Sequence, residues 1–184
     1  MVEEGSIVKQ TLNTLKKRLK ENDNIIQIQG EEGYLSRVKC TFNPPASDEE
    51  IKNFERQTGL ILPNDYKEFL KISNGCRLFD DIESGGEIEL YSLEQIIDLN
   101  EHYDEFEGCF DIAYIYQDNI VINSKHYSEK KKNYLFWKDH IEQFEEAIPL
   151  KMNFELWLDR FIISSGAKFW SWSIYTAENY YELS

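Results

Sequence analysis

The stretch LPNDYKEFLKISNG, residues 62–75, combines a proline, a short amphipathic helical segment and an Asn-Gly pair. Pro63 suits the first turn of a helix because it needs no backbone N–H there. Apolar residues at helical spacing then predict one buried face: Tyr66, Phe69 and Leu70. Asn74-Gly75 is typical of a left-handed helix stop. No residue type in this stretch suggests catalysis, so we interpret it as a structural signature.

The preceding residues, FNPPASDEEIKNFERQTG (42–59), predict a second helix with a defined start and stop. Ser47 can cap the helix and Glu50 completes a capping box, while Gly59 closes it in the left-handed conformation. Because only LILP (60–63) separates the two helices, at 48–58 and 64–73, we expect them to pack as an angled hairpin.

The rest of the chain alternates between strand and helix patterns. Alternating or β-branched runs predict strands at 24–29, 34–42, 87–91, 110–116, 119–124 and 133–137. Apolar residues at helical spacing predict helices at 4–21, 92–103 and 151–164, the first facing inward with Ile7, Leu12, Leu15 and Leu19. Ser92 and Gln95 predict a cap for the short middle helix. The expected fold is α+β, with an antiparallel sheet of about four to six strands flanked by helices.

Composition predicts a single domain over residues 1–184 with its own core, since 41% of the residues are hydrophobic and 14% aromatic. No run approaches the roughly 20 apolar residues of a membrane span, and the charged N-terminus lacks a signal-peptide core, which predicts a cytoplasmic protein without membrane contact. Three widely spaced cysteines predict buried free thiols: Cys40, Cys76 and Cys109. The aromatic segment after Gly166 either adds an edge strand or wraps over the body.

The net charge of −14 is concentrated in one interval. Between Arg77 and Lys125 there is no Lys or Arg. The same interval holds thirteen carboxylates: Asp80, Asp81, Glu83, Glu87, Glu89, Glu94, Asp98, Glu101, Asp104, Glu105, Glu107, Asp111 and Asp118. Such a tract repels nucleic acid and attracts basic partners, so we expect a protein partner and no nucleic acid.

Candidate chemistry is sparse in this sequence. The three histidines lie outside any metalloprotease motif or nucleophile elbow: His102, His126 and His140. A Cys-His dyad would depend on spatial proximity that the sequence does not reveal. The acidic run DDIESGGEIE (80–89) lacks the ligand spacing of a calcium loop. We therefore expect no catalytic residue, no metal site and no cofactor.

Taken together, residues 42–75 resemble the signature of the SUKH superfamily, the homologues of the fungal Smi/Knr regulators of cell-wall synthesis. The matching positions are Pro44, Glu50, Ile51, Phe54, Glu55, Gly59, Leu62, Pro63, Tyr66, Phe69, Leu70, Asn74 and Gly75. ELYSLEQI (89–96) and NFELWLDRFI (153–162) resemble later elements of that family, so the resemblance covers roughly residues 40–163. The N-terminal helix and the aromatic C-terminal extension lie outside it.

The resemblance implies an immunity protein that binds and neutralises a toxin domain, frequently a nuclease, without a cofactor. The alternatives are an intracellular scaffold or regulator like the fungal relatives, and an unrecognised enzyme. An acidic surface with aromatic anchors would suit a basic nuclease toxin, because such a toxin needs a cationic groove to hold phosphates. The candidate partner-binding residues are Asp80, Asp81, Glu83, Glu94, Asp98, Glu101, Tyr103, Asp104, Glu105, Phe106 and Glu107. For Phe106, a place in the core is the alternative.

Overall fold

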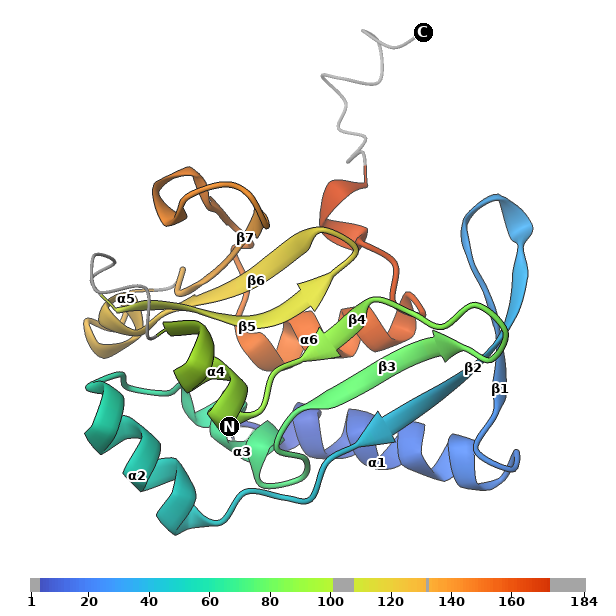
Figure 1. Cartoon of the computed structure of the whole chain (residues 1–184), viewed down its shortest axis with the longest axis horizontal. Helices are drawn as coiled ribbons and strands as arrows, with labels where there is room; N and C mark the ends of the chain where they lie inside the picture. The colour runs from blue at the N-terminus through green and yellow to red at the C-terminus, as the bar shows by residue number, and fades with distance from the viewer. Residues whose placement is uncertain (1–3, 101–107, 132, 173–184) are drawn as a thin grey trace, which may run out of the picture.

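The structure, a computed structural model, describes residues 4–100, 108–131 and 133–172 (Figure 1). The described strands form one antiparallel sheet whose order follows the sequence. They are β1 (Ile26–Gln29), β2 (Leu35–Phe42), β3 (Cys76–Asp81), β4 (Ile88–Leu90), β5 (Cys109–Ile115), β6 (Asp118–Asn123), β7 (Leu135–Asp139) and β8 (Ile148–Pro149). The described α-helices are α1 (Ser6–Lys20), α2 (Asp48–Thr58), α3 (Asn64–Leu70), α4 (Leu93–Asn100), α5 (Ser124–Ser128) and α6 (Phe154–Ile163).

The sheet confirms the α+β class and its antiparallel pairing, but the expected number of four to six strands is wrong, because the sheet has eight. The two unexpected strands are β3 and β8. Four of the six residues of β3 are buried, three of them in succession, so its sequence lacks the alternation that marks a half-exposed strand. β8 has only two residues and ends at Pro149, which leaves almost no pattern to detect.

The two helices of the signature form where the sequence places them. The Glu50 backbone N–H donates to the Ser47 hydroxyl at 3.2 Å, and the Glu50 carboxylate accepts from the Ser47 N–H at 2.7 Å, which completes the capping box. Gly59 closes α2 with a φ of 72°. α3 ends at Leu70, earlier than expected, and its apolar residues Tyr66, Phe69 and Leu70 are fully buried.

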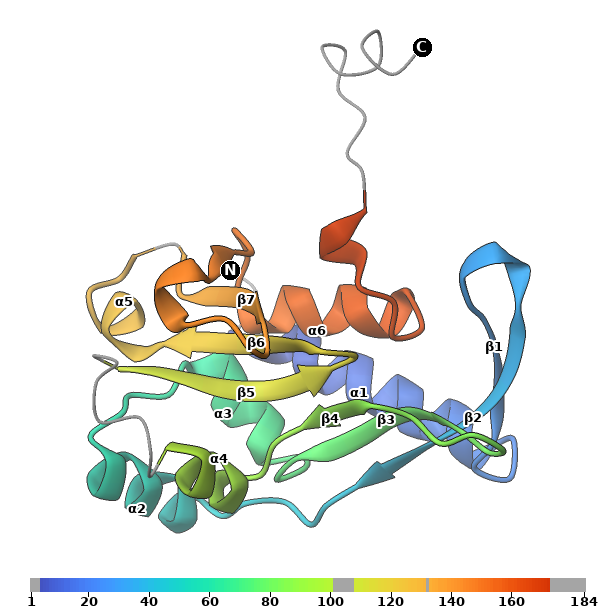
Figure 2. The same ribbon diagram turned by 45° about the horizontal axis from the view of Figure 1, so that its top comes forward.

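Three helices, α1, α3 and α6, pack together against one face of the sheet (Figures 1 and 2). Their aromatic side chains fill the core between helices and sheet. The Tyr66 and Phe154 rings meet edge to face at 4.9 Å, and Trp157 stacks on Phe161 at 5.2 Å. On α1 the buried positions are Val8, Leu12, Leu15 and Leu19. Val8 thus takes the inward position expected of Ile7, which is half-buried.

A buried carboxylate connects these helices. Asp65, at the start of α3, is fully buried and accepts hydrogen bonds from the Tyr134 hydroxyl at 2.7 Å and the Glu155 N–H at 3.0 Å. Because the Glu155 N–H lies in the first turn of α6, Asp65 satisfies a donor that the helix itself leaves unpaired. The Glu155 carboxylate does the same for α1: it accepts a hydrogen bond at 3.0 Å from the backbone N–H of Gly5, at the start of that helix.

The segment after α6 wraps over the body, which resolves the two alternatives for the part of it that the structure describes. A short 3₁₀ turn at Phe169–Ser171 brings the Trp170 ring 6.2 Å from Trp157 and 6.0 Å from Phe161. The Trp170 indole N–H donates to Asp118 at 3.1 Å. Residues 173–184 lie outside the described part of the chain.

Candidate partner-binding surface

The face of the sheet opposite α1, α3 and α6 carries a row of polar side chains, one from each of five neighbouring strands. Directly opposed Cα partners define it as Arg77, Glu89, Tyr114, Asn119 and Lys138. Opposed residues in an antiparallel sheet project to the same face. The sheet therefore presents a continuous polar row across β3 to β7.

At one end of this row, Arg77 forms ion pairs with two carboxylates, those of Asp80 and Glu89. Its guanidinium binds both carboxylate oxygens of Asp80, at 3.0 and 3.1 Å, and lies 3.5 Å from a carboxylate oxygen of Glu89. Asp80 is only 6% exposed, whereas the Arg77 side chain is 41% exposed. The charge of Asp80 is thus compensated inside the molecule, and its carboxylate faces Arg77.

At the other end of the row the polar groups are buried. The Asn119 amide donates to Asp111 at 2.6 Å, and the Lys138 ammonium lies 5.2 Å from the centre of the Phe144 ring. Asp111, Asn119 and Lys138 are each less than a tenth exposed. Burial raises the pKa of the Asp111 carboxyl, and the Lys138 charge and the Asn119 amide partly oppose that shift.

This buried carboxyl predicts a pH-dependent stability. The folded protein holds the Asp111 proton more tightly than the unfolded chain, whose pKa is about 3.9. The stability from this group is therefore fully present below about pH 4 and is lost as the pH rises through the raised folded pKa. We expect Asp111→Asn to show a smaller loss of unfolding free energy between about pH 4.5 and about pH 8 than the wild type, measured by urea titration. Asp98→Asn, at an exposed position, should keep the wild-type profile.

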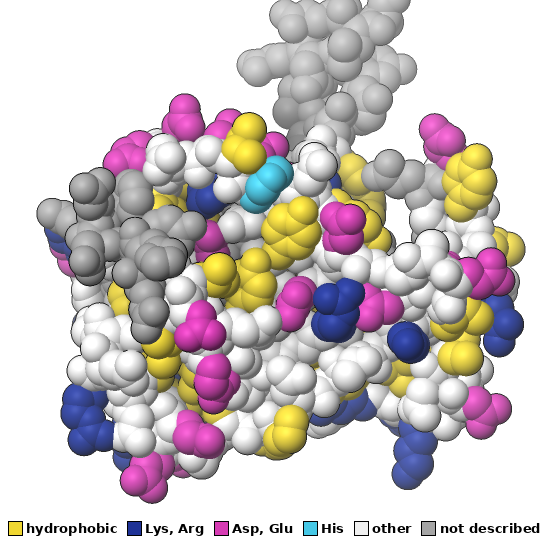
Figure 3. Space-filling model, in the orientation of Figure 1, with side chains coloured by type: hydrophobic (Ala, Val, Ile, Leu, Met, Phe, Trp, Pro, Cys, Tyr) yellow, Lys and Arg dark blue, Asp and Glu magenta, His cyan; other side chains and the backbone are white. Residues whose placement is uncertain are grey.

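The carboxylates that face solvent lie beside the polar row. Four exposed ones, which we call the acidic surface, are Glu83 in the β3–β4 loop, Glu87 next to β4, and Glu94 and Asp98 on α4. Within the described residues none of the four forms an ion pair with a Lys or Arg. Figure 3 shows Asp and Glu side chains gathered over α4 and on both sides of a basic side chain near the centre of this face. Among the described residues, no Lys or Arg therefore compensates the charge of the acidic surface.

Asp81 has a mainly local role at the edge of this surface. Its carboxylate accepts from the backbone N–H groups of Glu83 at 2.9 Å and Ser84 at 3.0 Å, which fixes the β3–β4 turn. These hydrogen bonds, that of Ser84 first, lower the pKa of Asp81. The side chain is half-buried and remains charged at neutral pH.

The expected residues differ in exposure. Glu83, Glu94 and Asp98 are exposed, Asp81 is half-buried and Asp80 is buried. The other expected positions lie outside the described residues: Glu101, Tyr103, Asp104, Glu105, Phe106 and Glu107. Glu87 and the half-buried Tyr114 join the surface without having been proposed. The signal for Tyr114 was the alternation in AYIY (113–116). It places Tyr114 on one face of the strand and its neighbours Ala113 and Ile115 on the other face.

The described residues with reactive side chains are engaged in structural contacts. The sulfurs of Cys40 and Cys109 accept hydrogen bonds from Phe79 N and Asn123 Nδ2, and burial raises the pKa of each thiol to about 11. The rings of His126 and His140 each contact a backbone carbonyl, at 2.9 and 3.1 Å. Among residues 4–100, 108–131 and 133–172, no three His, Cys, Asp or Glu side chains are grouped to hold a metal ion.

Comparison with known proteins agrees with this fold. Residues 45–160 match the SMI1/KNR4 family (SUKH-1), and the chain belongs to that family. This confirms the resemblance drawn from the signature at 42–75. In the part of the chain that the structure describes, every helix is too short or too polar to cross a bilayer.

Two Bacillus subtilis (strain 168) proteins, both uncharacterised, are similar to this chain over most of their length. YobM is 34% identical over 184 residues, covering 96% of this chain and 97% of YobM. YnaB is 39% identical over 145 residues, covering 77% of this chain and 93% of YnaB. KNR4/SMI1 homolog 1 of Debaryomyces hansenii is 29% identical over 73 residues, which cover 38% of this chain and 16% of the fungal protein.

Proposed function

We propose that this protein is an immunity protein that binds a cognate toxin domain and neutralises it through the acidic surface. The family to which the chain belongs includes toxin immunity proteins. The observation that carries the proposal is the acidic surface itself, where exposed carboxylates lack basic partners among the described residues. An uncompensated patch of one sign is suited to a partner of the opposite sign.

The chemistry of this surface favours a basic toxin domain, such as a nuclease. A nuclease must hold phosphates in a cationic groove, and the same groove attracts a surface rich in carboxylates. Tyr114 in the polar row and Tyr116, 44% exposed, add aromatic area next to Glu87. Aromatic residues commonly carry much of an interface's binding energy, and we extend the same role to Tyr103 and Phe106. The protein then acts by occupying a surface, without catalysis or a cofactor.

Reversing charges on α4 should slow association with the toxin. The double change Glu94→Lys and Asp98→Lys converts two exposed carboxylates of the acidic surface into cations. We expect the association rate constant at low salt to fall about tenfold, with a weaker dependence on ionic strength. Surface plasmon resonance with a catalytically inactive toxin domain measures both.

The matched control makes the same change in net charge away from the acidic surface, with Glu21→Lys just after the end of α1 and Asp159→Lys on α6. This control should retain most of the wild-type association rate. If the control and the α4 variant slow association equally, net charge is responsible and the acidic surface is not the interface.

Protection of growth tests the function directly. The toxin to test is any basic C-terminal domain of a large secreted protein that a gene next to this one encodes. We expect that producing this domain in a bacterial host stops growth, and that co-production of the immunity protein restores it through a stoichiometric complex. Continued arrest, despite both proteins being soluble and folded, would contradict the proposal.

A second candidate, an intracellular scaffold or regulator, is favoured by the match to the fungal KNR4/SMI1 homolog over 73 residues. The two candidates differ in what protein the chain binds. A scaffold should form complexes with the cell's own proteins in the absence of any neighbouring toxin gene. Failure of growth protection combined with such complexes would favour this candidate.

A further inference from the structure

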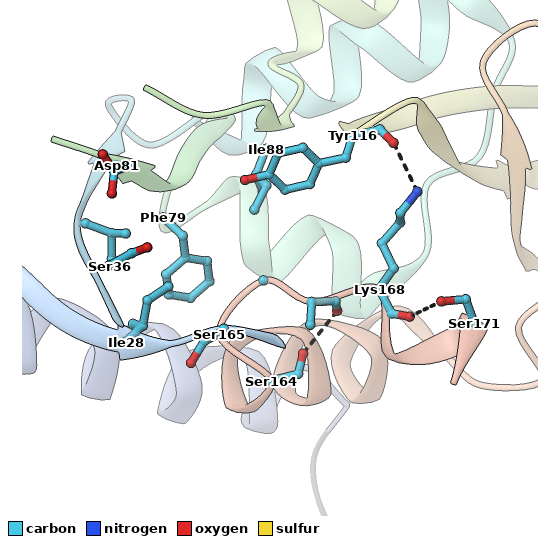
Figure 4. Close-up of a pocket in the computed structure, with 14 residues that line it drawn as sticks. Ile28, Ser36, Phe79, Asp81, Ile88, Tyr116, Ser164, Ser165, Lys168 and Ser171 are labelled. Atoms are coloured by element: carbon cyan, nitrogen blue, oxygen red, sulfur yellow. Dashed lines mark hydrogen bonds between the residues drawn. The ribbon is translucent and has the colours of Figure 1, made fainter. Parts of the chain in front are cut away.

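A pocket of about 480 Å³ opens between the β1–β2 hairpin and the segment that follows α6 (Figure 4). We call it the hairpin pocket. Its apolar wall is formed by Ile28, Val38, Phe79, Ile88 and Ala167. Serine residues, Asp81, Tyr116 and Lys168 make up much of the remaining lining. Its volume lies in the range of ligand-binding clefts.

The polar groups of the hairpin pocket favour a positively charged guest. In Figure 4, the Tyr116 ring reaches across the pocket toward the side on which Asp81 lies. One oxygen of Asp81 holds the β3–β4 turn, and the other, Oδ2, accepts no hydrogen bond from the described residues. Glu87 lies beside Tyr116, whose N–H donates to the Glu87 carbonyl at 3.2 Å. Burial raises the pKa of the Tyr116 hydroxyl, with Glu87, Asp80 and Asp81 adding to the shift.

The cation that lines the hairpin pocket is already neutralised. Lys168 donates to the Tyr116 carbonyl and to Asp118, both at 3.0 Å, so its charge is directed away from Asp81. Among the described lining residues, Asp81 is the carboxylate, and Glu87 lies next to the pocket beside Tyr116. A cationic guest would meet the Asp81 Oδ2 atom on one side and the face of Tyr116 on another.

The backbone around the hairpin pocket is held in an unusual conformation. Phe79, Tyr116 and Ser165 have φ values of 54°, 44° and 58°, in the left-handed region that bulky side chains rarely adopt. Gly166 packs so closely that a Cβ atom there would lie 2.8 Å from both Ile88 and Phe79. Strained residues concentrate at binding sites, where the surrounding structure maintains them. Here three such residues line one cavity, together with the closely packed Gly166.

We propose that the hairpin pocket receives a lysine or arginine side chain of the partner protein. The aliphatic stem of the guest packs against Phe79 and Ile88, and its cationic group lies between Asp81 and the Tyr116 ring. This inference rests on the proposed function, because it assigns an anchoring site to the same basic toxin. The site adjoins the acidic surface through Glu87, so one partner can contact both.

The test needs no toxin, so its result is independent of the growth assay. The ¹⁵N-labelled full-length protein is titrated with the peptide acetyl-Gly-Lys-Gly-amide and its arginine analogue, while amide shifts are followed by NMR. Peptides with norleucine or glutamate at the central position serve as uncharged and anionic comparisons. We expect saturable shifts at Phe79, Tyr116 and Gly166 with the cationic peptides, and an affinity at least about threefold lower with norleucine. The glutamate peptide should not bind.

Matched variants assign the charge effect to this pocket. The pair Asp81→Asn and Glu87→Gln removes two charges while keeping the Asp81 oxygen that holds the turn. It should weaken binding of the lysine peptide about threefold or more and leave the norleucine peptide unchanged. The pair Glu94→Gln and Asp98→Asn removes two charges on α4 and should have little effect.

Several outcomes would overturn the proposal. Equal affinity for lysine and norleucine peptides would make the pocket an apolar site. Equal weakening by the α4 pair would show a general charge effect. Nuclear Overhauser contacts between Phe79 and residues 173–184 in the free protein would show that the chain's own end occupies the pocket, and concentration-dependent shifts without peptide would indicate a second copy. Growth protection combined with any of these results would leave the proposed function intact and refute the lysine or arginine anchor.

Discussion

Replacing Asp65 with alanine is expected to lower the free energy of unfolding by about 3–5 kcal/mol. The change leaves the Tyr134 hydroxyl and the backbone N–H groups of Tyr66 and Glu155 facing a fully buried site without their acceptor. One of these donors lies in the first turn of α6, so the loss also loosens the start of the core helix. Urea unfolding followed by tryptophan fluorescence measures the effect.

Two further variants separate the hydrogen bonds from the general effect of mutation. Tyr134→Phe removes one donor to Asp65 and should cost about 1–2 kcal/mol. Asp98→Asn, on the exposed face of α4, should stay within about 0.5 kcal/mol of the wild type. If Asp65→Ala is as mild as Asp98→Asn, the buried carboxylate does not hold α3 and α6 together.

Replacing Gly75 with alanine should destabilise the protein by more than about 3 kcal/mol. Gly75 has a φ of 83°, and a Cβ atom there would lie 2.7 Å from the Ser92 backbone N and 2.9 Å from the Leu90 carbonyl oxygen. The neighbouring atoms belong to the backbone and cannot move aside as a flexible side chain could. Steric conflict therefore adds to the conformational strain of about 1–2 kcal/mol. Thermal and urea unfolding provide the measurement.

Gly59→Ala is the matched control, because Gly59 has nearly the same backbone conformation, with a φ of 72°, but no atom within 4 Å of an added Cβ. It should lose only about 1 kcal/mol, the strain of a left-handed alanine. Equal losses of unfolding free energy at the two positions would mean that the β4–α4 connection moves aside for an added Cβ at Gly75 at little energetic cost.

The elements that could be predicted from the sequence are those whose signals are local. The capping box of Ser47 and Glu50 lies within one turn of helix, as does the stop at Gly59. β3 gave no such signal, because four of its six residues are buried, three of them in succession, so its sequence lacks alternation. Its place in the sheet depends on pairing with β2, which is separated from it by two helices.

The sequence predicts the negative charge of the candidate site, but it does not predict which carboxylates are exposed on its surface. The acidic tract is visible in the sequence, yet Asp80, Asp111 and Asp118 are buried in the folded protein. Their partners explain why: Lys168 pairs with Asp118 across 50 residues of sequence, and Asn119 binds Asp111 across the β5–β6 hairpin. The polar row likewise exists only because strand register aligns one residue from each of five strands. Residue type alone does not carry this information.

The hydrogen bond between the first helix and the last sets the order in which the protein can be completed on the ribosome. Strands β1 to β8 pair in chain order, so each hairpin can form soon after its second strand emerges. The Gly5 N–H, however, meets Glu155 across 150 residues, and the apolar stripe of α1 packs against α6. At typical synthesis rates that separation corresponds to roughly 8–30 s. During that interval the part of α1 that packs against α6 stays uncovered and accessible to chaperones, and the packing of α6 against α1 then completes the core.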